Sequence, residues 1–129
     1  MPKTAKIVLD TNFLMIPGQI GLDIFKEIER GISKRIELFI CSGSLKELQK
    51  LTETGKGVNK RAAKLALELI ENKNIQIIPT EPGHVDDRLV ELSKQDYLIA
   101  TQDLGLKKRL KKYVYLRQKK YIEIRGVMD

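Results

Sequence analysis

Hydrophobic positions along this 129-residue chain fall into two patterns: short apolar runs, and segments in which they recur every three to four residues. The short runs are rich in β-branched residues, which is typical of strands buried on both faces of a parallel sheet. They predict strands at 7–9, 36–41, 75–79, 97–101 and 113–116, with a further antiparallel or edge strand at 121–124.

The segments with helical periodicity lie between these strands. They predict helices at 22–31, 44–51, 58–71, 86–92 and 104–112. Pro17-Gly18 is expected to interrupt the chain after the first strand, and 52–57 to form a flexible break. Ser44 and Glu47 have the spacing of a capping box at the start of the second helix.

Strands that alternate with helices predict right-handed crossovers and a parallel sheet covered on both faces. We therefore expect a three-layer α/β/α fold with a central, mainly parallel sheet of about five strands. The sequence shows no internal repeat, low-complexity tract or linker, so residues 1–129 are expected to form a single domain.

The composition fits a soluble globular protein, with 42% hydrophobic and 32% charged residues. No apolar run has the length of a membrane span, and no signal-peptide pattern follows Met1. Cys41 is the single cysteine, which excludes an internal disulfide and favours a cytoplasmic location. With one Cys and one His in the chain, no Cys/His zinc motif is present.

Positive charge is concentrated at the end of the chain. Residues 101–129 contain nine Lys or Arg and three acids, so they carry +6 of the total net charge of +7. A basic segment of this kind favours a polyanionic partner, and a solvated helix face is the alternative. Tyr113, Tyr115 and Tyr121 lie among these charges, either as stacking surfaces for bases or as half-buried strand residues. The candidate phosphate contacts are Lys107, Lys108, Arg109, Lys111, Lys112, Arg117, Lys119 and Lys120.

Acidic residues recur where predicted strands give way to helices. They are Asp10 after the first strand, Glu47 after the second, Asp86 and Asp87 after the third, and Asp103 after the fourth. The carboxyl ends of parallel strands meet at one edge of a sheet, where open α/β folds bind their ligands. Helix capping is the alternative, since acids favour helix N-termini. Capping accounts least well for Asp10 and Asp103, which follow the two most apolar strands.

Converging carboxylates cannot all remain ionised without a cation, because like charges raise one another's pKa. Ligation by oxygen alone favours Mg²⁺ or Mn²⁺ over zinc. The pattern therefore predicts a divalent metal site at the carboxyl edge of the sheet.

Four motifs, in this order and spacing, resemble the PIN domain family of small metal-dependent nucleases over nearly the full chain. They are Val8-Leu9-Asp10-Thr11-Asn12, Leu45-Lys46-Glu47-Leu48, Asp86-Asp87-Arg88-Leu89 and Ala100-Thr101-Gln102-Asp103. The resemblance implies that the catalytic, metal-binding acids are Asp10, Glu47, Asp86 and Asp103, and that their supporting residues are Asn12, Thr101 and Asp87. Asp86 is preferred to Asp87 as the ligand because Leu89 then falls where the family has an apolar residue.

The same resemblance implies a Mg²⁺- or Mn²⁺-dependent endoribonuclease that hydrolyses RNA without a side-chain nucleophile. Gly105 departs from the family pattern, since many members carry a fifth acid there. The basic ending is more similar to the archaeal branch related to ribosomal-RNA-processing PIN proteins than to a short toxin. RNA is the expected partner and no membrane is expected. A homodimer, an antitoxin and a pre-ribosomal particle are the partners left open.

Three alternatives remain at this point. An Asp-x-Thr-like start after the first strand is also found in aspartyl-phosphate enzymes, but these carry a second acid where this chain has Asn12. A non-catalytic RNA-binding scaffold would keep the same fold. A toxin ribonuclease of a toxin–antitoxin pair would keep the same site as an RNA-processing enzyme.

Overall fold

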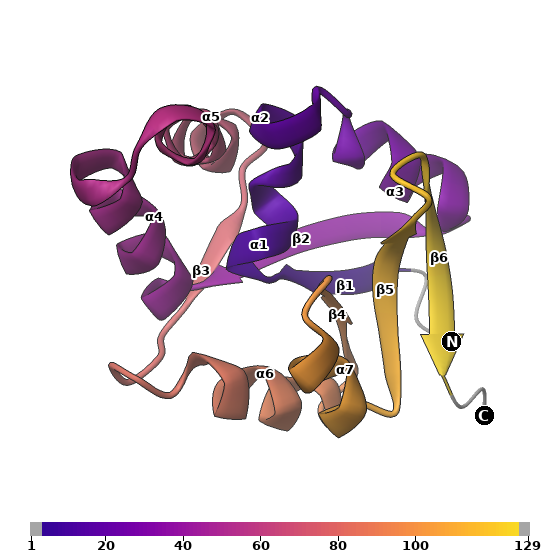
Figure 1. Cartoon of the computed structure of the whole chain (residues 1–129). Helices are drawn as coiled ribbons and strands as arrows, with labels where there is room; N and C mark the ends of the chain where they lie inside the picture. Colours follow the sequence, from indigo (N-terminus) through magenta and orange to yellow (C-terminus); the bar gives the residue numbers. More distant parts are fainter. Residues whose placement is uncertain (1–3, 127–129) are drawn as a thin grey trace.

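The computed structural model describes residues 4–126, in which six strands form one sheet (Figure 1). Their order is β3-β2-β1-β4-β5-β6, with β6 antiparallel to β5 and all other neighbours parallel. The strands are β1 (Thr4–Leu9), β2 (Arg35–Cys41), β3 (Gln76–Ile78), β4 (Tyr97–Ala100), β5 (Lys112–Arg117) and β6 (Tyr121–Gly126).

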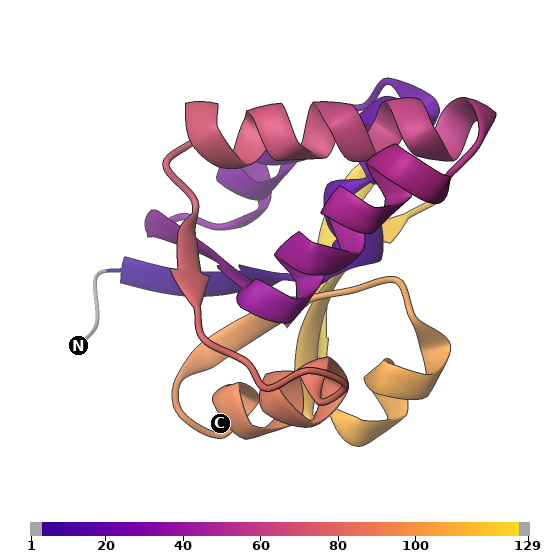
Figure 2. The ribbon, with the colours of Figure 1, turned by 90° about the vertical axis from the view of Figure 1, so that its left-hand side faces the viewer.

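Helices cover both faces of the sheet, as the two perpendicular views show (Figures 1 and 2). One face carries α1 (Thr11–Leu14), α2 (Ile16–Ile20), α3 (Ile24–Gly31), α4 (Ser42–Thr54) and α5 (Gly57–Asn72). The other carries α6 (Val85–Ser93) and α7 (Leu104–Arg109). The expected three-layer α/β/α fold with a mainly parallel sheet is therefore confirmed.

The central strand β1 contributes to two cores because successive side chains of a strand point to opposite faces. Ile7 and Leu9 pack into the core beneath α1 to α5, whereas Val8 packs into the smaller core beneath α6 and α7. All three side chains are fully buried. This explains the unbroken apolar run that predicted the strand.

The register of β1 and β4 brings the ends of these two strands together. Lys6 pairs with Tyr97 at the start of the ladder and Leu9 pairs with Ala100 at its end. The chain leaves both strands at the same point, so the polar residues that follow, Asp10 and Thr101, come side by side.

Several predicted boundaries are wrong. Pro17-Gly18 does not interrupt the chain but lies inside α2, where Pro occupies the first turn and needs no hydrogen-bond donor. Ser44 forms no capping box, because α4 already begins at Ser42 and has Cys41 at its N-cap. The break predicted at 52–57 is shorter, since α4 continues to Thr54.

Two further elements are shorter in the structure than predicted. The strand predicted at 75–79 extends only over Gln76–Ile78. The helix predicted at 104–112 ends at Arg109, and β5 begins three residues later, at Lys112. The strand predicted at 121–124 is present as the antiparallel edge strand β6. Asp129, counted in the charge of the basic segment, lies outside the described residues.

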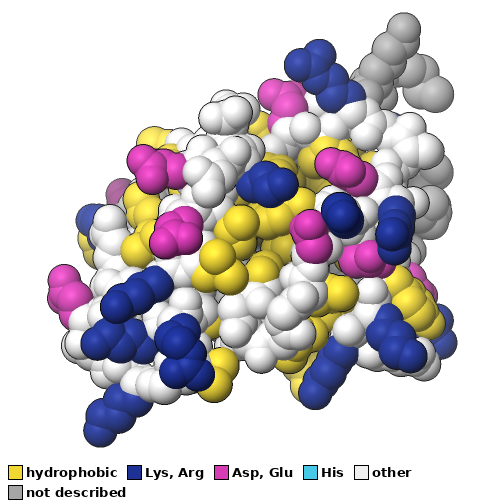
Figure 3. All heavy atoms as spheres, turned by 90° about the horizontal axis from the view of Figure 1, so that it is seen from above, with side chains coloured by type: hydrophobic (Ala, Val, Ile, Leu, Met, Phe, Trp, Pro, Cys, Tyr) yellow, Lys and Arg dark blue, Asp and Glu magenta, His cyan; other side chains and the backbone are white. Residues whose placement is uncertain are grey.

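The helical layer above the sheet presents apolar side chains in the middle of its face, with charges of both signs around them (Figure 3). A groove of about 330 Å³ between α2, α3 and α5 is lined by apolar residues that include Leu22, Phe25 and Leu65. Between residues 4 and 126, no helix is long and apolar enough to cross a membrane.

Candidate active site

Asp10 is the most enclosed acid of the candidate site, with 7% of its surface exposed. It follows β1 directly, and its own N–H extends the sheet ladder to the Ala100 carbonyl at 2.9 Å. One carboxylate oxygen accepts a hydrogen bond from the Thr11 N–H at 2.8 Å, which caps α1. The other accepts one from the Thr101 hydroxyl at 2.8 Å. Asp10 is therefore the N-cap of α1, and the expectation that capping accounts least well for it is wrong.

Thr101 joins Asp10 to Asp103. Its buried hydroxyl donates to Asp10 and accepts a hydrogen bond from the Asp103 N–H at 3.1 Å. The Asp103 carboxylate in turn accepts from the Leu106 N–H at 2.7 Å and so caps α7. A single hydroxyl thus fixes two acids that lie 93 positions apart in the sequence.

Glu47 on α4 and Asp86 on α6 approach this point from the other side because the N-terminal ends of their helices are in close contact. A Cβ added at Gly43 would lie 2.4 Å from Val85 Cγ2, so only glycine permits this approach. The Thr80 N–H donates to the Ser42 hydroxyl at 2.9 Å, which fixes the segment before α6 against the start of α4.

The four carboxylates of Asp10, Glu47, Asp86 and Asp103, which we call the acidic edge, influence one another electrostatically. Burial raises the pKa of Asp10, and the negative charges of Asp86 and Asp103 raise it further. The hydrogen bonds from Thr101 and Thr11 act in the opposite direction. Burial also raises the pKa of Glu47, followed by repulsion from Asp10 and Asp86. The acidic edge therefore carries more negative charge than its surroundings neutralise.

Among the side chains that the structure describes, no three acids, histidines or cysteines lie close enough to hold one ion. Hydrogen bonds fix the carboxylates of Asp10 and Asp103, whereas Glu47 and Asp86 are exposed. To bind a cation, the side chains of Glu47 and Asp86 would therefore have to move towards those of Asp10 and Asp103. The donors are oxygens, as a hard divalent cation requires.

Two buried hydroxyls beside these acids make no hydrogen bond of normal geometry: Thr11 Oγ1 and Ser44 Oγ. Thr11 follows Asp10 and lies near the Glu47 carboxylate, and Ser44 precedes Glu47 by one helical turn. The Thr11 hydroxyl acts on the Glu47 carboxylate, whose pKa it lowers. The fit of the acidic edge to a divalent cation therefore rests on its carboxylate oxygens and not on these hydroxyls.

Asp87 is directed elsewhere. Its carboxylate pairs with the Arg109 guanidinium at 2.6 Å, which links α6 to α7, and lies 3.5 Å from Nδ1 of His84. The hydrogen bond from Arg109 lowers the pKa of Asp87, followed by that from His84. Asp86, not Asp87, is the member of the pair that acts electrostatically on Asp10 and Glu47.

Two further expectations concern Asn12 and Gly105. Asn12 is exposed on α1, so the structure gives it no buried contact with the site. A Cβ at Gly105 would lie 3.3 Å from the Asp103 carboxylate. A fifth acid at this position would therefore stand directly beside Asp103 and add to its negative charge.

The predicted basic segment is partly engaged in contacts within the protein. Lys107 Nζ lies 4.7 Å from the Tyr115 ring centroid and 5.6 Å from that of Tyr113, and both tyrosines are half-buried strand residues. Arg117 pairs with Glu123 at 2.9 Å. The remaining candidates are exposed: Lys108, Lys111, Lys112, Lys119 and Lys120, together with Arg109.

The sequence reasoning missed Gln102 as a positioning residue. Its side chain donates to the Leu116 carbonyl at 3.1 Å and accepts from the Leu116 N–H at 2.6 Å. This pair of bonds ties the exit of β4 to β5 and so holds Thr101 and Asp103 in place. A polar side chain between two site residues at a strand exit was the available signal.

Comparison with known proteins places the chain among nucleases. A family model described as PIN like domain matches residues 7–119. Ribonuclease VapC4 of Methanocaldococcus jannaschii is 34% identical over 131 residues, which cover 95% of this chain and 98% of the relative. The structure of the PIN domain endonuclease Utp24 has the same fold, with a TM-score of 0.80 at 23% identity over 99% of this chain and 96% of that one. A domain of a functionally unknown protein from Methanocaldococcus jannaschii gives a TM-score of 0.56 at 19% identity over 97% of this chain and 99% of that one.

Proposed function

The chain belongs to the PIN domain family of ribonucleases, and from this membership we propose that it is a Mg²⁺- or Mn²⁺-dependent endoribonuclease. The proposed metal ligands are Asp10, Glu47, Asp86 and Asp103. The observation that carries the proposal is the convergence of these acids on the buried Asp10 carboxylate, which the Thr101 hydroxyl links to Asp103 and whose pKa Asp86 and Asp103 help to raise. A divalent cation is the simplest partner for such a charge.

The residues of this chain would orient and hold the reacting groups. Thr101 fixes the carboxylate of Asp10 and, through its contact with Asp103, keeps the two acids at a constant separation. The ion, when bound, supplies an acidified water as the nucleophile and stabilises charge that develops on the phosphodiester. The exposed lysines after Asp103 would hold flanking phosphates while the acids act on one bond.

For the cellular role we propose ribosomal RNA processing, with the basic ending of the chain as its support. A toxin of a toxin–antitoxin pair is the second candidate, favoured by the similarity to ribonuclease VapC4, and would add an antitoxin as partner. Either enzyme would act in the cytoplasm on RNA. Two experiments in cells separate these roles. Sequencing of RNA ends that finds cuts at ribosomal precursor sites supports processing. Growth arrest on expression of the protein, relieved by the product of a neighbouring gene, supports the toxin.

Cleavage of a loop-containing RNA tests the proposed chemistry. We expect internal cuts with Mg²⁺ or Mn²⁺ and none with EDTA. Asp10→Asn and Asp86→Asn should each reduce the rate by at least about 100-fold, because even supporting residues of metal sites contribute about 10- to 100-fold.

Asp87→Asn is the matched control, since it removes the same charge one position away and its carboxylate faces Arg109. It should retain most of the activity. Full activity in Asp10→Asn would contradict the nuclease proposal, and RNA binding without cleavage in the wild type would favour the non-catalytic scaffold. Equal losses at Asp86 and Asp87 would contradict the choice of ligand.

A further inference from the structure

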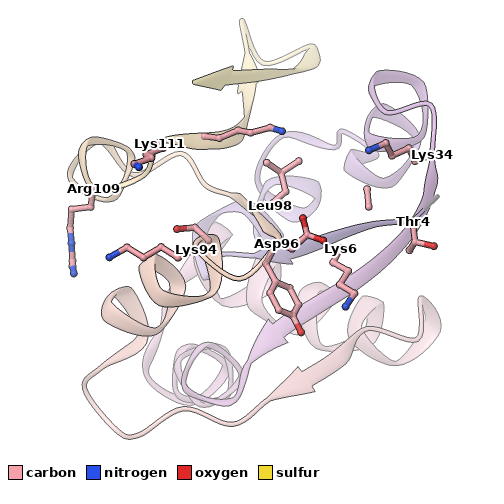
Figure 4. Close-up of a pocket in the computed structure, with 12 residues that line it drawn as sticks. Thr4, Lys6, Lys34, Lys94, Asp96, Leu98, Arg109 and Lys111 are labelled. Carbon is pink, nitrogen blue, oxygen red and sulfur yellow. The ribbon is translucent and has the colours of Figure 1, made fainter. Parts of the chain in front are cut away.

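A second cavity lies at the opposite edge of the sheet, where β1 and β4 begin. It has a volume of about 720 Å³ and is lined at β1 by Thr4 and Lys6 and at the end of α6 by Ser93 and Lys94. Its basic side chains are Lys6, Lys34, Lys94, Arg109, Lys111 and Lys112. We call this cavity the basic cleft. Figure 4 shows Lys94, Arg109 and Lys111 on one side and Lys6 and Lys34 on the other, with Asp96 between them.

The basic cleft and the acidic edge occupy opposite ends of the same elements. Lys6 precedes Asp10 by four residues along the strand direction, a distance of about 13 Å at about 3.3 Å per residue. On α6, Asp86 lies in the first turn and Lys94 at the C-cap, about 12 Å away at about 1.5 Å per residue. The direct separation of about 12–13 Å sets the least length of RNA, a few nucleotides, that could join the two sites.

Helix geometry alone does not account for this concentration of positive charge. Lys94 and Arg109 lie at the C-terminal ends of α6 and α7, where cations are favoured by the helix dipole. Lys34 and Lys111 also follow the C-caps of α3 and α7 closely, but Lys6 lies in β1 and has no such reason to be there. Arg109 is partly neutralised by Asp87, but the cleft still contains five lysines and a single acid, Asp96, among its described lining residues.

We propose that the basic cleft binds the phosphate backbone of the RNA substrate a few nucleotides away from the bond that is cut. This inference rests on the proposed function, because it assigns the cleft to the same RNA strand that is cut at the acidic edge. The cleft joins Arg109, Lys111 and Lys112 of the predicted basic segment to three lysines outside it, Lys6, Lys34 and Lys94.

RNA is favoured over an acidic protein segment as the occupant for two reasons. The polar groups Thr4, Ser93 and Asp96 line the cleft among the lysines, and hydroxyl and carboxylate groups of this kind are suitable partners for the 2′-hydroxyls of RNA. The cleft and the acidic edge also lie at the two ends of α6, so one RNA strand that passes along this helix can reach both.

The test compares Lys6→Gln/Lys34→Gln/Lys94→Gln with a control variant, Lys26→Gln/Lys56→Gln/Lys64→Gln. The control removes the same charge from exposed lysines of α3, α5 and the turn before α5. Binding of a labelled 12-nucleotide single-stranded RNA is measured by fluorescence anisotropy over a range of KCl concentrations. EDTA is present to prevent cleavage, so that binding is measured alone. A second variant, Lys34→Gln/Lys94→Gln, spares Lys6, whose Nζ lies 5.4 Å from the Tyr97 ring centroid.

We expect the cleft variant to bind at least about tenfold more weakly at low salt, with a log–log salt slope that is smaller by about 2, since each phosphate contact to a single strand contributes about 0.7. In Mn²⁺, its cleavage rate should fall for the 12-nucleotide RNA but not for a dinucleotide, whose single phosphodiester leaves no flanking phosphate for the cleft. If the wild type binds RNA without cleaving it, the proposed function fails while the binding comparison still tests the cleft.

An unchanged salt slope in both cleft variants overturns the proposal. So does an equal change in the control, which would show that only the net charge matters. Poly-glutamate that binds the wild type but not the cleft variant, with RNA affinity unaffected, would assign the cleft to an acidic protein and would overturn the proposal as well.

Discussion

At the carboxyl edge of the sheet, Asp10 is 7% exposed and held by two hydrogen bonds, whereas the lysines at the amino edge are exposed side chains on strand starts, loops and helix ends. Asp10 and Asp103 are therefore held by hydrogen bonds at the ends of β1 and β4. The lysines of the basic cleft share only their exposure and their charge. Under the proposed function, catalysis would need the fixed geometry of the acids, whereas phosphate binding would need only the positive field of the lysines.

The largest effect is expected when the Thr101 hydroxyl, which links Asp10 to Asp103, is removed. Thr101→Val keeps the shape of the side chain but leaves Asp10 without one donor and the Asp103 N–H without its acceptor. We expect RNA cleavage to fall by about 10- to 100-fold and the free energy of unfolding by about 1–3 kcal/mol. Rate measurements and urea unfolding check both, and RNA affinity should stay unchanged. Wild-type activity in this variant would show that the fixed geometry is dispensable.

A smaller effect is expected from the charge of Asp10 itself. Because its pKa is raised in the folded protein, the folded state binds its proton more tightly than the unfolded chain does. The resulting stability is complete below the ordinary pKa of 3.8 and is lost as the pH rises through the folded value. Metal-free Asp10→Asn should therefore melt a few degrees above the wild type at pH 7, with about 4 °C for each kcal/mol, and this advantage should shrink at pH 4.

Adding Mn²⁺ should reverse that order. A ligand that binds only the folded state stabilises it, by about 2.7 kcal/mol at a concentration of 100 times its Kd. Wild type should gain this stabilisation and Asp10→Asn should not. Calorimetry that shows the same response to Mn²⁺ in both proteins would contradict the metal assignment.

The smallest effects should separate two neighbouring lysines on the basic side. Lys107 lies over the rings of Tyr113 and Tyr115, so Lys107→Gln should cost about 0.5–1 kcal/mol of stability. Lys108 is exposed, and Lys108→Gln should leave stability unchanged while lowering the RNA salt slope by about 0.7. Thermal melts and RNA titrations of both variants test this. Identical behaviour would remove the distinction between structural and phosphate-binding lysines.

The difference between the two edges also explains which features could be predicted from the sequence. The apolar run that ends at Asp10 predicted the central strand, because burial on both faces leaves a continuous hydrophobic signal. Strand alternation then predicted that Asp10 and Asp103 would share one edge, and the strands that precede them, β1 and β4, are neighbours. Short-range signals were less reliable: the Ser44 capping box failed because α4 starts two residues earlier, and Pro17 was accepted in the first turn of a helix.

The basic cleft was beyond sequence reasoning for a physical reason. Lys6, Lys34 and Lys94 are isolated charges in three separate segments, and an exposed lysine leaves no pattern in its surroundings. Only the register of β1 with β2 and β4 brings these segments to one place.

The hydrogen bond between Thr101 and Asp10 joins residues 91 positions apart. The acidic edge can therefore form only after both segments have been synthesised. β1 is made early in synthesis, but its partner β4 and the neighbouring β5, which supports Thr101 through the Val114 carbonyl, come about a hundred residues later. Contacts of this sequence separation form late in folding because their loop closure is costly. A nuclease built in this way is inert while it is being translated, and the RNA of the ribosome that makes it is exposed to a finished active site only after nearly the whole domain has emerged.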